Sequence, residues 1–143
     1  MNKPPIGAFG FIVNFSDNED SATSYFQEVT GLSIRIDTDD LQEGGINNIT
    51  HKIIKYASYG DVTLKRGLTD TRFYNWINEF INGTFSRKDI TITVINDNNE
   101  PELTYKLLNT IPKQWNGPNL NVMQDAIATE SIVLAVEGIV VIK

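Results

Sequence analysis

The feature that most constrains the fold is a change of apolar period between residues 60 and 83. Val62 and Leu64 alternate with polar residues, which is the two-residue period of a β-strand, and Gly67 ends that run. Apolar side chains then recur at the i, i+3, i+4, i+7 and i+8 positions of one helical face: Phe73, Trp76, Ile77, Phe80 and Ile81. The sequence therefore predicts a strand followed by one amphipathic helix.

Residues that favour helix ends bracket this apolar stripe. Thr69 or Asp70 can cap the start of the helix through a side-chain oxygen. Gly83 lies where a left-handed residue commonly ends a helix. These signals predict a helix at about 70–82.

Strand patterns account for most of the remaining chain. Apolar residues alternate, or gather in short runs between turn signals, at residues 9–15, 25–29, 32–36, 49–57, 90–95, 103–107 and 127–142. The polar residues 97–100 make residues 90–107 the clearest hairpin. We therefore expect a mainly β fold: an antiparallel β-sandwich or barrel of about seven or eight strands with one amphipathic α-helix.

Two prolines frame the segment that follows this hairpin. Pro112 and Pro118 each fix φ and remove a backbone N–H donor. The sequence thus predicts a rigid connector from Ile111 to Pro118, in which Trp115 packs over the barrel end.

An unusual segment between residues 37 and 59 predicts a projecting arm. The chain is acidic and then glycine-rich from Thr38 to about Asn48, as expected for a bend or an arm. Residues 49–57 contain adjacent Ile53 and Ile54, which a strand would place on opposite faces. Such an element is buried either in its own core or against a partner. We expect a single domain over residues 1–143 with an arm at about 37–59.

Composition limits the classes of function and indicates in which compartment the protein is made. The chain has no cysteine, which excludes disulfides and thiol catalysis, and its net charge of -6 disfavours a general phosphate-binding surface. No apolar signal region follows Met1, and the apolar stretch Ile132–Ile142 is too short to span a bilayer, which needs about 20 residues. We expect synthesis in the cytoplasm without a signal peptide, and no stable membrane anchoring.

No catalytic, cofactor-binding or metal site is predicted. His51 is the single histidine, and no G-x-S-x-G motif presents a nucleophile to it. Counted from Asp37, the sixth and twelfth positions are Gln42 and Asn48, where a calcium-binding loop needs Gly and Glu. Phosphate-binding glycine motifs do not occur. A hydrolytic site of two paired carboxylates is not excluded by the sequence, because the fold sets the distance between the two side chains.

Several segments, taken in order, resemble the tail tube protein family of contractile phages and contractile injection systems. Residues 26–32 read F-Q-E-V-T-G-L, similar to the family's F-x-E-V-S-G-L, with Thr30 in place of Ser. Residues 112–118 match P-x-x-W-x-G-P, although Lys113 and Gln114 are less apolar than in many members. Residues 127–138 match I-x-x-E-x-x-x-L-x-x-E-G. The other similar segments are Phe11–Val13, Glu43–Gly45, Val62–Gly67 with the helix carrying Trp76, and Arg87–Ile90.

The resemblance implies a structural subunit rather than an enzyme. Such subunits assemble into homo-hexameric rings that stack into a hollow tube, with the fold shared by the ring protein of type VI secretion. A sheath protein surrounds the tube, and baseplate or tube initiator and tube terminator proteins close its ends. Sheath contraction drives the tube through a target envelope, and cargo effectors or DNA pass through the lumen. The implied location is a phage tail or an extracellular injection particle.

The residues and the resemblance together suggest three groups of functional residues. The arm is expected to reach the next ring through Asp39, Asp40, Glu43, Gly44, Gly45, Ile53 and Ile54. The helix is expected to divide between core and lateral contact through Phe73, Trp76, Ile77 and Phe80. A hydrophilic channel needs polar lining, for which the candidates are Thr91, Thr93, Thr104 and Lys106.

Other functions stay open at this point. A monomeric barrel that binds a small ligand would line its cavity with Phe9, Phe11 and Phe15. A carboxylate-dependent hydrolase on the same fold is a further alternative. Within the family, the sequence does not separate the main tube from the baseplate-proximal tube initiator, or a phage tail from an extracellular injector.

Overall fold

Strands dominate the structure, as the alternating sequence patterns predict. A computed structural model describes residues 10–15, 24–42, 50–67, 71–98, 100–120 and 128–142. In chain order its elements are β1 (Gly10–Phe15), β2 (Ser24–Phe26), β3 (Glu28–Thr30), β4 (Ile34–Gln42), β5 (Thr50–Tyr59), β6 (Val62–Gly67), α1 (Arg72–Ile81), β7 (Lys88–Ile95), β8 (Pro101–Asn116), β9 (Thr129–Ala135) and β10 (Gly138–Ile142). The expected mainly β fold with one helix is confirmed.

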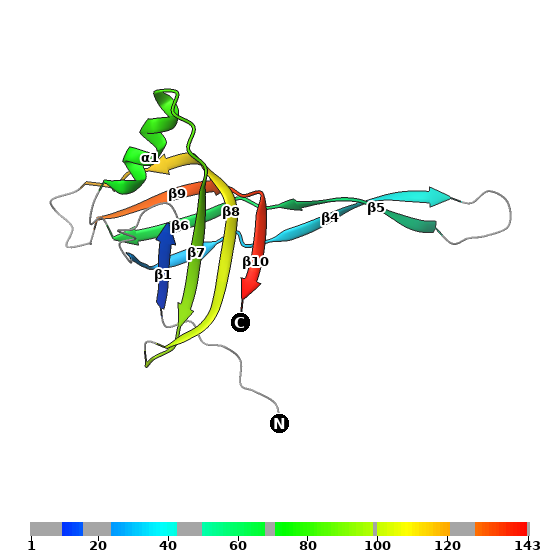
Figure 1. Ribbon diagram of the computed structural model, residues 1–143, viewed down its shortest axis with the longest axis horizontal. Coiled ribbons are helices and arrows are strands. Elements are labelled where there is room, and N and C mark those ends of the chain that lie inside the picture. Colours follow the sequence, from blue (N-terminus) through cyan, green and yellow to red (C-terminus); the bar gives the residue numbers. More distant parts are fainter. Residues whose placement is uncertain are drawn as a thin grey trace.

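The main sheet closes into a barrel. Its strands follow the order β2-β1-β7-β8-β9-β6-β3, every pairing is antiparallel, and β10 also pairs with β8. Only Gln27 separates β2 from β3, and its N–H donates a hydrogen bond of 2.9 Å to the Lys65 carbonyl. Because β2 lies at one edge of the sheet and β3 at the other, this short bent segment joins the two edges (Figure 1).

β8 is long enough to serve two groups of strands. Its first part pairs with β7 and β10, and its last residues pair with β9. The strand bends at Asn109, which has a positive φ of 51° and whose N–H donates to the Asp89 carboxylate. The expected rigid connector is wrong for residues 111–116, which belong to this strand. Pro112 is accommodated because it lies at a register shift, where its missing N–H does not interrupt the ladder.

α1 follows the predicted helix closely. It begins at Arg72 with Thr71 as its N-cap, which makes no side-chain capping hydrogen bond, while Thr69 and Asp70 lie outside the described residues. Gly83 has a φ of +91°, and its N–H donates to the Phe80 carbonyl. The Thr84 N–H donates to the Glu79 carbonyl, so the helix ends in a Schellman motif.

The core fills the end of the barrel that α1 covers. Phe15 contacts the rings of Phe73 and Trp76 edge to face, with centroid distances of 6.1 and 5.7 Å. These three side chains join the inward-facing residues of the strands, which include Val13, Val62, Leu64, Ile90, Ile92, Leu107, Ile132 and Leu134. Burial of each large apolar side chain stabilises the fold by about 1.5–3 kcal/mol. The helix is thus fixed to the barrel by its apolar stripe.

β4 and β5 form a two-stranded ribbon that projects from the barrel (Figure 1). Their register joins Ile34 to Tyr59 at the barrel and Gln42 to Thr50 at the far end. A β-bulge between Asp37 and Thr38 leaves Lys55 without a direct partner in the register. Glu43, Gly44 and Gly45 lie outside the described residues. Within the described part of the chain, no helix has the length and apolar character to cross a membrane.

Candidate assembly surfaces

One face of the β4–β5 ribbon is apolar next to the barrel. Ile34 and Ile36 point to the same face because they are two residues apart, and Ala57 is paired with Ile36. The bulge shifts β5 by one residue, so that Ile54, paired with Thr38, joins this face. Ile34, Ile36 and Ile54 are 55%, 57% and 73% exposed. We name these three side chains and Ala57 the inner ribbon face.

The opposite face of the ribbon also exposes apolar side chains. Ile53 is paired with Asp39, and Leu41 is paired with His51. Ile53 and Leu41 both lie on the face away from Ile54. Tyr56, Ile53 and Leu41 are all exposed. The structure thus places Ile53 and Ile54 on opposite faces, and a ribbon with two apolar faces leaves water-exposed surface that a partner can cover.

Ion pairs hold the charged residues of the ribbon. Asp40 pairs with Lys52, and the Asp39 carboxylate lies 3.2 Å from the Lys55 ammonium. Arg35 and Asp37 form a third pair at 2.9 Å. The pairs of Asp39 and Asp40 are solvent-exposed on both sides, and such an ion pair contributes at most about 1 kcal/mol. Asp39 and Asp40 are therefore strand residues of the ribbon that make little difference to the stability of the fold.

The four candidate lumen residues lie together on the outer face of the barrel wall. Thr91 is paired with Lys106, and Thr93 with Thr104, across β7 and β8. They alternate with the buried Ile90, Ile92 and Val94, so they point away from the core. β10 extends this face, because Val140 is paired with Lys106 and Ile142 with Thr104. The result is a polar strip with an apolar margin.

β10 presents an open strand edge beside this strip. Within the described residues β10 pairs with β8 alone, so its other edge carries backbone groups without a strand partner. Val140, Val141 and Ile142 are 43%, 54% and 50% exposed. An exposed apolar edge strand is a ready site for pairing with a strand of another chain.

A buried ion pair links β6 and β9 below α1. Arg66 Nε lies 2.9 Å from Glu130 Oε1, and their side chains are 1% and 0% exposed. Trp115 Nε1 donates to Glu130 Oε2 at 3.0 Å, and the Arg66 guanidinium lies 4.3 Å from the centre of the Phe73 ring. A buried pair with this many partners satisfies both charges and orients the helix over the sheet.

Sequence reasoning missed this pair, although a signal was present. Arg66 continues the inward-facing series of Val62 and Leu64, and Glu130 occupies the same place before Ile132 and Leu134. Opposite charges at inward positions of two strands predict a buried partnership.

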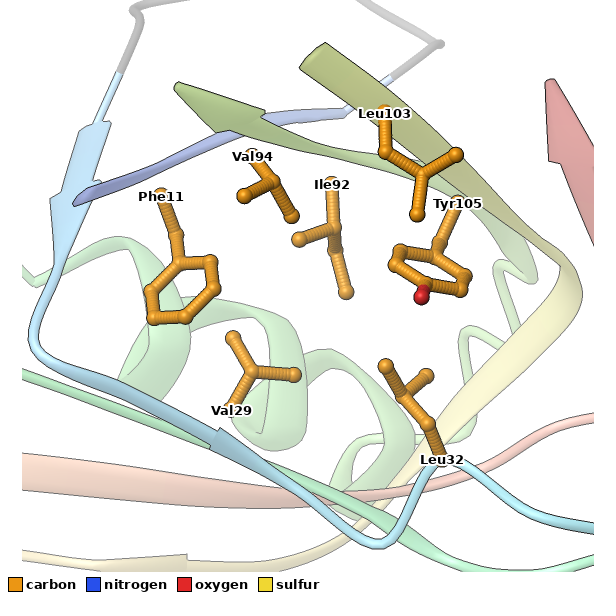
Figure 2. A pocket seen from close by; sticks show the side chains of 7 residues that line it. All are labelled: Phe11, Val29, Leu32, Ile92, Val94, Leu103 and Tyr105. Carbon is orange, nitrogen blue, oxygen red and sulfur yellow. The ribbon is translucent and has the colours of Figure 1, made fainter. Parts of the chain in front are cut away.

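An apolar pocket of about 250 Å³ opens in the barrel (Figure 2). It lies near the ends of β1 and β7 where Gly10 pairs with Ile95, away from α1, and the segment around β3 forms its opposite wall. Its lining consists of Phe11, Val29, Leu32, Ile92, Val94, Leu103 and Tyr105. We name this cavity the barrel pocket.

The described residues offer little for metal chemistry. His51 is exposed on the ribbon, opposite Leu41. Among these residues, no three His, Cys, Asp or Glu side chains are grouped so that they could hold a metal ion.

A closed barrel with a two-faced apolar ribbon and an open strand edge defines a subunit with surfaces for copies or partners. The model of the T4-like virus tail tube protein gp19 family matches residues 7–140, and the chain belongs to that family. The protein is thus a structural subunit of the inner tube of a contractile tail or injection system.

Solved structures of injection systems share the fold over almost the whole chain. A chain of the PVC sheath-tube complex, from an extracellular contractile injection system, is 28% identical over 96% of this chain and 91% of that chain, with a TM-score of 0.82. A chain of the PVC sheath/tube terminator is 27% identical over 99% of both chains, with a TM-score of 0.83. Hcp1 from Flavobacterium johnsoniae shares the fold at 17% identity, with 93% and 94% of the two chains covered and a TM-score of 0.58. A comparison with curated proteins gave no match.

Proposed function

We propose that this chain forms a single tail-tube domain, residues 1–143 with an arm at 37–59, that builds homo-hexameric rings stacked around a lumen. The observation that carries this proposal is the ribbon, whose exposed isoleucines on both faces need cover that the barrel does not give. A ring requires a contact between two different patches of the subunit, repeated until it closes. The open edge of β10 supplies one such patch.

The ribbon is the proposed contact between rings. It carries the inner ribbon face on one side and Ile53, Leu41 and Tyr56 on the other, so it fits between two neighbouring surfaces rather than on one. The Glu43–Gly45 segment belongs to the same arm. The helix residues Ile77 and Phe80, which are half-buried, are proposed to contribute to lateral contact, while Phe73 and Trp76 are buried in the core.

The polar strip of Thr91, Thr93, Thr104 and Lys106 is the proposed lining of the lumen. Its side chains suit a water-filled channel through which a hydrophilic cargo effector or DNA moves. The proposal includes a surrounding sheath, a baseplate or initiator and a terminator as further partners, and no covalent chemistry by the subunit. The similar chains in sheath-tube and sheath/tube terminator structures support a sheath and a terminator as partners.

The direct test is assembly of the purified chain with and without the ribbon end. We expect native mass spectrometry to show hexamers, and electron microscopy to show tubes when assembly is seeded with the baseplate. Deletion of residues 40–48 should shorten the tubes and leave a folded subunit. Unchanged tube length would contradict the role of the arm, and a strict monomer would contradict the tube.

A small-ligand barrel is the second candidate, and the barrel pocket is the observation that favours it. Phe11 lines the pocket as that function requires, but Phe15 is buried under α1 and Phe9 lies outside the described residues. A monomer that binds a small apolar compound with 1:1 stoichiometry would support this alternative over the tube.

A further inference from the structure

A small apolar knob protrudes where α1 ends. Ile81 is 75% exposed and Phe85 74% exposed, on either side of the turn at Gly83. The Phe85 ring packs against the Phe80 ring with a centroid distance of 5.6 Å, which fixes one of its edges and leaves the rest in solvent. We name Ile81 and Phe85 the helix-end knob. Phe is one of the aromatic residues that are enriched at protein interfaces.

The knob and the barrel pocket lie at opposite ends of β7. The knob precedes Lys88, where the strand begins, and the pocket is lined by Ile92 and Val94 near its other end. A strand of this length extends about 3.4 Å per residue, roughly 25 Å in all. The knob cannot reach the pocket of its own chain, because Phe73 and Trp76 hold α1 in the core.

The two surfaces match in size and chemistry. A cavity of about 150 Å³ is enough to hold a benzene ring, so the 250 Å³ pocket can hold the Phe85 ring. Residues 81–86 read I-N-G-T-F-S and carry no charge, and the exposed Arg87–Glu137 ion pair begins two residues after Phe85. The ribbon is a poorer occupant, because the Asp39–Lys55 pair beside Ile53 and Ile54 would have to leave water with them.

We propose that the helix-end knob of one copy inserts into the barrel pocket of the next copy. The contact joins two different patches, so it repeats in one direction along an assembly. This inference rests on the proposed function, since it assigns one of the copy-to-copy contacts of the tube. It also gives the unfilled end of the barrel an occupant.

The absence of native cysteine allows a direct cross-linking test. A Phe85→Cys/Leu32→Cys double variant, treated with a short thiol cross-linker under assembly conditions, should give a ladder of covalent oligomers. An equal mixture of the two single variants should give mainly the covalent dimer. The matched control is an Ile54→Cys/Leu32→Cys double variant, which should give no ladder; a ladder from this control alone would overturn the proposal by making the ribbon the occupant.

A second measurement covers the energetics of the same contact. Phe85→Ser should weaken association of copies at least tenfold, whereas Phe85→Leu should retain it, and circular dichroism should show both variants folded because the side chain is exposed. If the wild-type chain forms tubes but the Phe85→Cys/Leu32→Cys double variant gives no cross-linked product, this inference is overturned and the proposed function stays intact. A wild-type chain that stays monomeric would overturn both.

Discussion

Arg66 and Glu130 show how single residues fix the relation between helix and barrel. Their ion pair is fully buried, Trp115 donates to the same carboxylate, and the Phe73 ring of α1 lies against the guanidinium. The pair therefore joins two strands to the helix at one point. Loss of one partner leaves the other charge buried without compensation.

Glu130→Ala should lower the free energy of unfolding by about 3–5 kcal/mol, because it strands the Arg66 charge in the core. The Arg66→Met/Glu130→Leu double variant should be more stable than either single variant, since no buried charge remains. Urea unfolding at fixed protein concentration measures both effects. Asp61→Asn, which breaks the half-exposed pair with Lys113, is the matched control and should cost at most about 1 kcal/mol. Additive losses in the double variant would contradict this account.

Gly31 and Gly83 show two different reasons why a position in the chain needs glycine. Both have φ near +90°, but a Cβ at Gly31 would lie 2.0 Å from the Asp61 carbonyl oxygen, whereas a Cβ at Gly83 would meet nothing within 4 Å. Gly83→Ala should cost only the backbone strain of roughly 1–2 kcal/mol. Gly31→Ala should lower the midpoint of thermal unfolding by clearly more, and equal midpoints would rule out the predicted clash.

At the scale of elements, the ribbon combines a predictable strand pattern with an unpredictable partner. Ile53 and Ile54 occupy opposite faces because they are adjacent in one strand, and the bulge near Lys55 adds Ile54 to the inner ribbon face. Each face can therefore be tested separately for a contribution to the proposed contact with another copy.

Ile53→Asn and Ile54→Asn should each shorten assembled tubes, because each removes apolar cover from one face of the ribbon. Both side chains are exposed in the subunit, so its thermal unfolding midpoint should shift by no more than a few degrees. Tube lengths measured by electron microscopy test the effect, with Lys65→Gln, an exposed change on β6 outside the ribbon, as the control. A normal length for one variant would show that the corresponding face has no partner.

Local periodicity explains which elements could be predicted from the sequence. The stripe of α1 and the hairpin β7–β8 follow from residue spacing and turn chemistry alone. The continuation of β8 through Pro112 could not be predicted, because it depends on a register shift set by β9. Closure of the barrel through Gln27 likewise depends on strands far apart in sequence.

The candidate surfaces also differ in whether the sequence could predict them. Alternation along each strand marked Thr91, Thr93, Thr104 and Lys106 as polar-face residues, and the pairing of β7 with β8 places them on one face. The helix-end knob and the barrel pocket could not be predicted. Their exposure depends on which end of the barrel the helix covers, which is a property of the tertiary packing.

At the scale of the whole molecule, the barrel separates two environments. The face with Lys106 is polar, the interior is apolar except around the Arg66–Glu130 pair, and the ribbon leaves the barrel to one side (Figure 1). In the tube that we propose, such a subunit could vary the polar strip of Thr91, Thr93, Thr104 and Lys106 without changing its contacts with other copies.

Lys106→Glu tests this separation. The half-buried lysine lies opposite Thr91, so the variant should reverse one charge per subunit in the proposed lumen and alter cargo loading several-fold. Ring formation, followed by native mass spectrometry, should not change, and Thr104→Ser is the conservative control. Loss of rings would place Lys106 at an interface between copies.

The continuity of β8 has a mechanical consequence. One uninterrupted backbone runs from the strands beside β10 to the strands beside β9, so a sudden push on one group reaches the other through covalent bonds. Paired strands that are held by hydrogen bonds, such as β4 and β5, separate under a smaller force than is needed to break a backbone. In the tube that we propose, a load would thus distort the β4–β5 ribbon of a subunit before it breaks the wall that contains β8.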